Sequence, residues 1–393
     1  MRKKLLCSVL LTLLLALACA AACAGEARDL TALCAFSGSR GATQKYEVLY
    51  NGNYSHYWQA DKAKYTWLEV RLPAGETCSG VQIKWAEINP NWCIEIRENG
   101  EWVRYAGHEE DYLTTWTELP GVTEFRIAAH NRVANYLRIN QLYVFSEGER
   151  PAGVQVWEPT FEKADLLLVA AHPDDEYVFM GAVIPYYGAE RGRNVLVAYI
   201  TESTSERRTE LLDGLWTAGQ RSYPLTGKFH DRFSTDMGVC YKRLGKKKTQ
   251  AYMIELFRHY RPDVVVTHDI RGEYGHGVHK ICADIVINAL KKSGNAKYGK
   301  KSAKLYGTWD VPKCYIHLYA KDRVVFDWNM RLSAFEGRTA YEVADAAFRC
   351  HLSQQHTEYE VYTEGPYDSQ IFGLYRSTVG PDTEHNDFFE HLD

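Results

Sequence analysis

The stretch LLLVAAHPDDEYVF, Leu166–Phe179, combines the two patterns that decide the fold of this chain. Its first six residues are all apolar, as in a strand that is buried on both faces of a sheet. Polar residues follow almost at once: His172, Asp174, Asp175 and Glu176. Because ligands of open α/β sheets bind at the carboxyl ends of the strands, this stretch predicts a buried strand that ends in a functional site.

Apolar strands and helical patterns alternate along the whole segment from residue 161 to 393. The predicted strands are Asp165–His172, Asn194–Thr201, Asp263–Asp269 and a segment near Tyr315. The predicted helices are a stretch that ends near Glu190, then Glu206–Gly219, Thr249–Tyr260, a helix that starts near His279, and Thr339–Leu352. This alternation predicts an α/β domain of three layers, with helices on both faces of a mostly parallel sheet.

Residues 26–148 follow a different pattern, in which apolar and polar residues alternate in short runs. The predicted strands are Trp67–Pro73, Val81–Trp85, Cys93–Glu98, Glu124–Ala129 and Leu137–Phe145. Short half-buried strands between turns predict an all-β sandwich. We expect most of its tryptophans in the core. Trp58 and Trp92 lie beside turn residues, and the alternative for them is an exposed ring that stacks on a sugar.

A polar, turn-rich segment, Glu147–Gly153, separates the two patterns and is interpreted as part of a linker. The chain has 393 residues, more than one typical domain of ~100–200 residues, so we expect a multidomain protein. The predicted divisions are a signal segment at 1–24, a β-sandwich module at 26–148, a linker at 149–160 and the α/β domain at 161–393.

The first 24 residues have the pattern of an export signal, because a basic start at residues 2–4 precedes a long apolar run. The tripeptide Ala22–Ala24 has the A-x-A form that signal peptidase accepts, which predicts cleavage after Ala24. Two alternatives are a lipidated cysteine at Cys19 or Cys23, and an uncleaved run of ~20 residues that anchors the chain in a membrane. All three predict a secreted or cell-surface protein, with membrane attachment only through this segment.

Composition argues against some partners and sites. The formal net charge is −4, and the one tight basic run, Lys246–Lys248, has no interleaved aromatic residues to stack on bases. We therefore expect no nucleic-acid partner. Seven cysteines follow the signal without C-x-x-C spacing, so a cysteine zinc site is not expected. Their positions allow a few disulfides in an oxidising compartment, and their odd number leaves at least one thiol unpaired.

A second polar cluster, THDIRGEYGHGVH at Thr267–His279, follows the strand predicted at Asp263–Asp269. His276 and His279 stand in H-x-x-H spacing, which places both on one face of a helix. Taken alone, HPDD also fits a structural role, in which Pro173 forces a turn and an aspartate caps the next helix. Two such clusters at two strand ends favour a functional site.

The residue types in these clusters indicate metal chemistry. Two imidazoles and one carboxylate with an open fourth position are the common ligand set of a catalytic zinc ion. Zinc lowers the pKa of a bound water from ~16 towards ~7, and a free carboxylate nearby can then take its proton. A remaining histidine can protonate a leaving group or hold an oxyanion. The pattern therefore predicts metal-assisted hydrolysis of an amide or ester. The sequence has no G-x-S-x-G elbow and no G-x-G-x-x-G after a strand, which argues against a serine hydrolase and a dinucleotide site.

The motif AAHPDDE, paired with the distant YGHGVH, resembles the PIG-L (LmbE-like) de-N-acetylases. This resemblance covers residues 164–393 and implies a Rossmann-like fold, one zinc ion per chain, and removal of acetyl or related acyl groups from N-acylated sugars. The matched positions imply that His172, Asp175 and His279 are the zinc ligands. They also imply that Asp174 is the general base.

The resemblance implies roles for other residues as well. His276 falls on the second catalytic histidine of the family, which acts as general acid or oxyanion partner. Tyr274 matches a tyrosine that in some members helps to polarise the carbonyl. Arg207 and Glu210 fit an R-x-x-E helix motif, in which the arginine lies near the substrate and the glutamate is structural.

One departure from the family pattern concerns the second cluster. Many relatives have H-P-D-H where this chain has HGVH at His276–His279, so the aspartate that orients the catalytic histidine is missing. Glu273 and Asp269 are candidate substitutes. Glu176 is interpreted as a helix-start carboxylate that faces the helix dipole. His268 and Asp269 are expected to support the ligands, with Asp269 a candidate to orient a metal-bound histidine.

The first half of the chain resembles discoidin-type (coagulation-factor type C) modules. This resemblance implies an eight-stranded jelly-roll sandwich that binds carbohydrate. The residues that carry it are LYNGNYSHYWQA at Leu49–Ala60, WLEVRLP at Trp67–Pro73 and LRINQLYVFSEG at Leu137–Gly148. Asn51 stands where the family usually has aspartate, and Tyr57 precedes the tryptophan.

Together these patterns predict an exported zinc-dependent deacetylase that acts on N-acetylglucosamine-type sugars of a glycan or glycoconjugate. One alternative is hydrolysis of another N-acyl or ester bond at the same zinc site. Another is a non-catalytic carbohydrate-binding adhesin with a vestigial metal site. The intact set of polar positions favours an enzyme.

Overall fold

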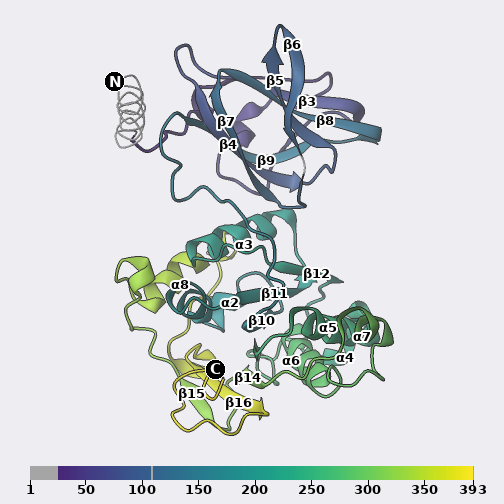
Figure 1. Ribbon diagram of the computed structural model, residues 1–393, viewed down its shortest axis with the longest axis vertical. Coiled ribbons are helices and arrows are strands. Elements are labelled where there is room, and N and C mark those ends of the chain that lie inside the picture. Colours follow the sequence, from purple (N-terminus) through teal and green to yellow (C-terminus); the bar gives the residue numbers. More distant parts are fainter. Residues whose placement is uncertain (1–24, 108, 393) are drawn as a thin grey trace, which may run out of the picture. The chain divides into compact units, whose positions relative to one another are not determined.

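The computed structural model describes residues 25–107 and 109–392. This part of the chain forms two compact units, with the boundary between Val156 and Trp157 (Figure 1). The export segment predicted at residues 1–24, with its lipidation alternatives at Cys19 and Cys23, lies outside the described residues. Among the described residues, none of the helices has both the length and the apolar character needed to cross a bilayer.

The first unit consists of two antiparallel β-sheets, of order β1-β3-β8-β5-β6 and β2-β9-β4-β7. The strands are β1 (Ala35–Gly38), β2 (Trp58–Gln59), β3 (Ala63–Arg71), β4 (Cys78–Glu87), β5 (Trp92–Glu98), β6 (Glu101–Gly107), β7 (Thr114–Val122), β8 (Glu124–Asn135) and β9 (Arg138–Ser146). All five strands predicted here are confirmed. Four others were not predicted. Among them, β6 lies at a sheet edge and is largely exposed, so its burial does not alternate.

Alternation along the strands of the first unit produces its core. Leu68 and Val70 of β3 and Ile83 of β4 are fully buried. The exposed-ring alternative is wrong for both tryptophans in question, because Trp58 is 0% and Trp92 is 4% exposed. The indole N–H of Trp58 donates to a backbone carbonyl, and the ring of Trp92 packs against a second core tryptophan.

The second unit is built on a seven-stranded sheet of order β12-β11-β10-β13-β14-β16-β15. The strands are β10 (Leu166–Ala170), β11 (Val195–Glu202), β12 (Leu225–His230), β13 (Val264–Thr267), β14 (Lys313–His317), β15 (Arg323–Val325) and β16 (Ile371–Ser377). Strands β10 to β14 run parallel to one another, while β16 pairs antiparallel with β14, and β15 pairs antiparallel with β16 at the sheet edge. The predicted mostly parallel sheet is confirmed.

Helices cover both faces of this sheet (Figure 1). On one face, α4 (Met237–Leu244), α5 (Lys246–Tyr260) and α6 (Gly277–Leu290) share a buried core with the sheet, and α7 (Lys300–Tyr306) packs on α5. On the other face lie α2 (Asp175–Val178), α3 (Ser205–Thr217) and α8 (Ala340–Phe348), and α8 contacts both of the others. Every residue of β10 is fully buried, as its unbroken apolar run predicts.

The helix predicted to continue to about Glu190 is interrupted. α2 ends at Val178, and a π-helix, η3 (Pro185–Glu190), forms the later part. Between them, Gly181 has a φ of 56°, and a Cβ at this position would lie 2.4 Å from the indole nitrogen of Trp328. The chain therefore turns here at a residue that must be glycine.

All seven cysteines among the described residues are free thiols. The disulfides that the composition allowed are therefore not formed between them. Five of the seven are buried, which is the usual state of inert cysteines: Cys78, Cys93, Cys240, Cys282 and Cys314.

Candidate metal centre and active site

The ends of β10 and β13 bring the two polar clusters together. The strands are parallel neighbours, with Leu166 opposite Val264 and Val169 opposite Thr267. The segments that follow these two strands therefore leave the sheet at the same edge. The HPDDE turn follows β10, and the loop at residues 268–276 follows β13 and leads into α6.

The HPDDE turn holds Asp174 in an unusual backbone conformation. Asp174 has a φ of 110°, which is strained for a residue with a side chain. Its backbone N–H donates to Oε2 of Glu176 over 2.8 Å, and Glu176 is fully buried beside His351. Glu176 does start a helix, as interpreted from the sequence. Its carboxylate, however, holds this turn in the interior and does not serve as an exposed helix-start charge.

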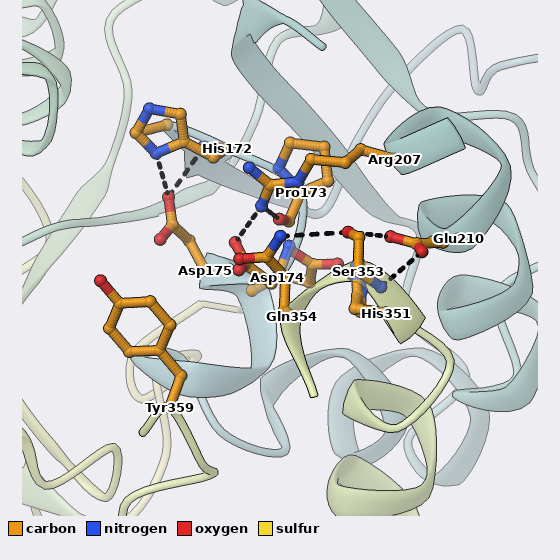
Figure 2. Close-up of polar contacts among 12 residues, drawn as sticks. His172, Pro173, Asp174, Asp175, Arg207, Glu210, His351, Ser353, Gln354 and Tyr359 are labelled. Carbon is orange, nitrogen blue, oxygen red and sulfur yellow. Dashed lines mark hydrogen bonds and ion pairs between the residues drawn. The ribbon is translucent and has the colours of Figure 1, made fainter. Parts of the chain in front are cut away.

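Arg207 contacts the same turn from α3. Thr204 caps α3, and its Oγ1 accepts the backbone N–H of Arg207, which places Arg207 in the first turn of the helix. The guanidinium donates to the carbonyl of Pro173, and its Nη2 lies 3.0 Å from Oδ1 of Asp174 (Figure 2). Arg207 lines the cavity, as expected for a residue near the substrate, and it also holds Asp174 in place.

Asp174 has the electrostatics of a general base. Burial raises the pKa of its carboxyl to about 7, although the Arg207 guanidinium acts in the opposite direction. A carboxyl that titrates near 7 can take up and return a proton at neutral pH.

Glu273 is the central carboxylate behind the site. It is fully buried, and it accepts hydrogen bonds from Nδ1 of His279 (2.6 Å), His268 (3.0 Å) and His317 (3.0 Å). Because Nδ1 of His279 donates to Glu273, Nε2 keeps a free lone pair for a cation. The expectation that Glu273 orients His276 is wrong, since the other three histidines occupy its carboxylate.

The three ligands implied by the motif converge. Oδ2 of Asp175 lies 3.2 Å from Nδ1 of His172, and Oδ1 lies 3.4 Å from Nε2 of His279. The Nε2 atoms of His172 and His279 are buried and form no hydrogen bond with any described residue, although each faces a carboxylate oxygen, that of Asp231 at 3.3 Å and that of Asp175 at 3.4 Å. Buried polar atoms without partners are costly, so these two nitrogens are suited to an external ligand.

The surroundings of His172 also favour a positive charge. Burial by itself would lower the pKa of the imidazole, but the adjacent carboxylates of Asp175 and Asp231 raise it to about 9. A divalent cation can supply this positive charge in place of a proton. The unpartnered nitrogens and the nearby carboxylates therefore fit a metal ion held by His172, Asp175 and His279.

His268 lies among the ligands but is not free to coordinate a metal. Its Nε2 accepts the backbone N–H of Ala171 over 3.0 Å, and its Nδ1 faces Glu273. It has the supporting position that we expected, even though Asp175, His268 and His279 are close enough to hold an ion. Asp269 donates its backbone N–H to Glu273 and lines a separate cavity. Glu273, and not Asp269, therefore orients the candidate ligand His279.

His276 packs against the candidate ligands. Its ring centroid lies 5.0 Å from that of His172 and 4.7 Å from that of His279. Burial and these two imidazoles lower the pKa of His276 to about 3, so the ring is neutral. Because a ring nitrogen lies within 4.8 Å of those of His172 and His279, His276 is also a candidate ligand.

Tyr274 lines the cavity beside His276, with ring centroids 5.5 Å apart. Burial raises the pKa of its hydroxyl far above the usual range, so the group stays protonated. A protonated phenol can donate a hydrogen bond to an oxygen in the cavity, which agrees with the role that the motif implies.

Glu210 anchors the C-terminal segment to the site. Its carboxylate is 1% exposed and accepts both the backbone N–H (2.7 Å) and the hydroxyl (2.6 Å) of Ser353. The hydroxyl of Ser353 in turn accepts the side-chain amide of Gln354 over 3.0 Å (Figure 2). The second residue of the R-x-x-E motif thus has a structural position.

A cavity of about 170 Å³ opens over these groups. It is lined by His172, Asp174, Asp175, Val178, Phe179, Arg207, Asp231, Phe233, Tyr274, His276, Gln354 and Tyr359. A single water needs only about 10–15 Å³ on the same measure, so the cavity can take a group of several heavy atoms. The remainder of a larger ligand would lie at the open mouth.

Sequence reasoning missed several of the lining residues. Asp231 and Phe233 follow β12, where Oδ2 of Asp231 lies 3.3 Å from Nε2 of His172 and the ring of Phe233 lies 5.1 Å from that of His276. Gln354 and Tyr359 come from the segment after α8. The sequence predicts a specificity loop at residues 226–245, but this range contains β12 and α4, and only the segment between them is a loop. No motif in it distinguishes the residues that face the cavity.

The fold and the site define a metal-dependent hydrolase, in which two histidines and a carboxylate can hold a cation beside a second carboxylate. Residues 167–290 match the family model described as PIG-L: GlcNAc-PI de-N-acetylase. The 1D-myo-inositol 2-acetamido-2-deoxy-alpha-D-glucopyranoside deacetylase 2 of Saccharopolyspora erythraea is 30% identical over 206 residues, which cover 46% of this chain and 73% of that protein. The chain therefore belongs to the PIG-L family, and it is a metal-dependent deacetylase of N-acetylated sugars.

Comparisons with solved structures give weaker similarities. N,N'-diacetylchitobiose deacetylase from Pyrococcus horikoshii is 18% identical, with a TM-score of 0.36, over 50% of this chain and 72% of that chain. A family 32 CBM from C. perfringens NanJ is 19% identical, with a TM-score of 0.25, over 30% of this chain and 97% of that chain. Scores this low support no conclusion about substrate or ligand.

Proposed function

We propose that this protein is an exported, zinc-dependent hydrolase that removes acetyl groups from N-acetylglucosamine-type sugars of a glycan or glycoconjugate. The observation that carries the proposal is that Nε2 of His172 and Nε2 of His279 are buried without a hydrogen bond, while the carboxylate of Asp175 contacts both rings. The name of the Saccharopolyspora erythraea relative, a deacetylase of an acetamido sugar, supports the substrate class.

The residues present fit zinc better than harder cations. Two imidazoles and one carboxylate are a common zinc ligand set, whereas magnesium and calcium prefer oxygen ligands. A bound zinc ion would polarise the acetamide carbonyl and lower the pKa of a water. His172, Asp175 and His279 would hold the ion, and Glu273 fixes the ring of His279 for this purpose.

Asp174 performs the proton transfers in this proposal. Its carboxylate takes a proton from the attacking water and returns it to the amine that leaves. His276 is the weaker candidate for this second step, because a ring with a pKa of about 3 holds little proton at neutral pH, whereas the carboxyl of Asp174 titrates at about 7. Neutral His276 and the hydroxyl of Tyr274 instead donate hydrogen bonds to the carbonyl oxygen as its negative charge grows.

The first unit and the N-terminal segment complete the proposal. We propose that the two antiparallel sheets form a jelly-roll, discoidin-like module that holds the enzyme on its glycan. Residues 1–24 would direct the chain out of the cytoplasm, with the secreted form preferred over a lipid-anchored one. Glycan retention by the full chain, compared with a chain that starts after Val156, tests the first point, and fractionation of expressing cells tests the second.

Acetate release tests the activity. The full chain is incubated with chitooligosaccharides, peptidoglycan fragments and mucin-type glycans, before and after removal of metal by a chelator. We expect acetate from at least one substrate, loss with the chelator, and recovery with Zn²⁺. Release of another acyl or ester group alone would favour the second hydrolase reading. Glycan binding without any hydrolysis by the zinc-loaded chain would favour the adhesin reading.

A further inference from the structure

The side chain of Gln354 is fixed at the cavity by two partners in series. The carboxylate of Glu210 can only accept, so the hydroxyl of Ser353 donates to it. The oxygen of Ser353 therefore has lone pairs left, and one accepts a hydrogen from Nε2 of Gln354. This order of donors settles the orientation of the carboxamide, because its nitrogen must face Ser353.

The backbone around Gln354 is held equally firmly. Its N–H donates to the carbonyl of His351 over 2.9 Å, and its own carbonyl accepts the N–H (3.0 Å) and hydroxyl (2.6 Å) of Thr357. The backbone is therefore fixed at this position, and the hydrogen bond to Ser353 orients the carboxamide. A carboxamide held in this way can recognise a ligand without first losing rotational freedom.

The oxygen of the carboxamide remains available. With Nε2 towards Ser353, Oε1 points away from it, and Gln354 and Asp174 line the same cavity. Gln354 lines the cavity, and its Oε1 accepts no hydrogen bond from any described residue. A fixed acceptor at this place would suit a hydrogen-bond donor of the bound molecule.

We propose that Gln354 is a substrate-binding residue, whose Oε1 accepts a hydrogen bond from a hydroxyl group of the N-acetylated sugar ring. Ser353 and Glu210 are positioning residues that act through Gln354. The proposal rests on the proposed deacetylase function. It adds that the cavity recognises a hydroxyl group of the substrate as a hydrogen-bond donor. An N-acetylated sugar offers ring hydroxyls as donors close to its acetamido group, whereas an acylated amine without such hydroxyls would leave Oε1 unpaired and bind less well.

The test combines a substitution with modified substrates. Gln354→Met keeps the length of the side chain but removes both polar atoms, and we expect kcat/KM for the best substrate to fall about 3- to 10-fold, mainly through KM. Deoxy analogues of that substrate, each lacking one ring hydroxyl, are then compared in wild type and variant. For one analogue, kcat/KM of the wild type should fall by the same factor as the substitution causes. In the variant, removal of that hydroxyl should cause no further fall in kcat/KM.

Ser353→Ala provides the test of positioning. It removes the hydroxyl that holds Gln354, so KM should rise less than in Gln354→Met, and Ser353→Thr should restore it. The matched control is Ser333→Ala. Ser333 donates to Glu190 over 2.9 Å in a similar serine–glutamate contact outside the cavity, and its loss should leave kcat and KM unchanged.

The outcomes are separable. Gln354 does not bind a sugar hydroxyl if the wild type releases acetate and Gln354→Met retains full kcat/KM. The same conclusion follows if each deoxy analogue lowers kcat/KM by the same factor in the wild type and the variant. Gln354→Asn, which keeps the amide but shortens its reach, serves as second variant if the melting temperature of Gln354→Met falls. If wild type releases no acetate from any N-acetylated sugar, the proposed function itself fails.

Discussion

Both units bury carboxylates beside histidines, but among the described residues only the α/β unit has buried histidine nitrogens without a hydrogen-bond partner. In the first unit, Glu95 is 4% exposed, accepts the hydroxyl of Tyr65 over 2.8 Å and faces Nε2 of His130 over 2.7 Å. In the α/β unit, Nε2 of both His172 and His279 is buried with no hydrogen bond to the described chain. An unpaired buried histidine nitrogen costs free energy and can bind a metal ion, so the contrast locates the candidate metal site in the α/β unit.

The contrast also shows that proximity alone does not make a metal site. Ligand atoms of Cys93, Glu95 and His130 lie within 4.8 Å of one another, as do those of His172, His276 and His279. In the first group, however, the carboxylate is already paired, and burial and the charge of Glu95 raise the pKa of the Cys93 thiol to about 11. A protonated thiol beside a paired carboxylate has little to offer a cation.

The substitution with the largest expected effect on the metal site of the α/β unit is His279→Ala. It removes a ligand that Glu273 has oriented, so we expect less than one metal ion per chain and acetate release no higher than in the chelated wild type. Elemental analysis and the acetate assay measure both. Full metal content in this variant would exclude His279 from the ligand set.

Glu273→Gln tests whether the carboxylate behind the ligands acts through the metal. Loss of such a partner typically weakens metal binding about 10- to 100-fold, and the same is expected here because Glu273 fixes the ring of His279. Competition with a chelator measures the affinity. Excess Zn²⁺ should restore most of kcat, and failure to do so would assign Glu273 a more direct role.

Arg207→Gln should change the pH dependence. Asp174 acts as base only when deprotonated, so activity falls as the pH drops through its pKa, which burial raises to about 7. The Arg207 guanidinium lowers that pKa, and its removal should raise it further. The acidic limb of kcat/KM should therefore move to higher pH. A shift to lower pH, or none, would contradict the pairing of these two residues.

The smallest effect is expected in the first unit. Glu95→Gln replaces a paired carboxylate on the five-stranded sheet, where His130 is largely exposed, so the free energy of unfolding should change by about 1 kcal/mol or less. Metal content and acetate release should not change. A loss of bound metal in this variant would mean that the Glu95 cluster is a site after all.

The strand ends could be predicted from the sequence, because local patterns determine them. The apolar run before His172 and the H-x-x-H spacing of His276 and His279 predict that both polar clusters lie at one edge of one sheet. β10 and β13 are indeed neighbours. The role of the Glu273 carboxylate was less predictable. Glu273 stands six residues before His279, yet only the turn between them directs its carboxylate to three histidines instead of to His276.

The rest of the cavity depends on contacts between distant segments. Asp231 reaches His172 from the loop after β12, and Gln354 reaches the cavity only because Ser353 is held by Glu210, 143 residues earlier. No periodicity or spacing encodes such contacts. The same holds for Trp58, whose turn-rich surroundings gave an exposed alternative although its indole is completely buried.

The most direct test of the account is Asp174→Asn, because it separates the base from the metal ligands beside it. Asp174 lies one residue before Asp175 but contacts Arg207, whereas Asp175 contacts the histidines. We predict a variant with wild-type zinc content and acetate release lower by about 10²- to 10⁴-fold, the usual contribution of a general base. A zinc-loaded Asp174→Asn that releases acetate at the wild-type rate would contradict the account.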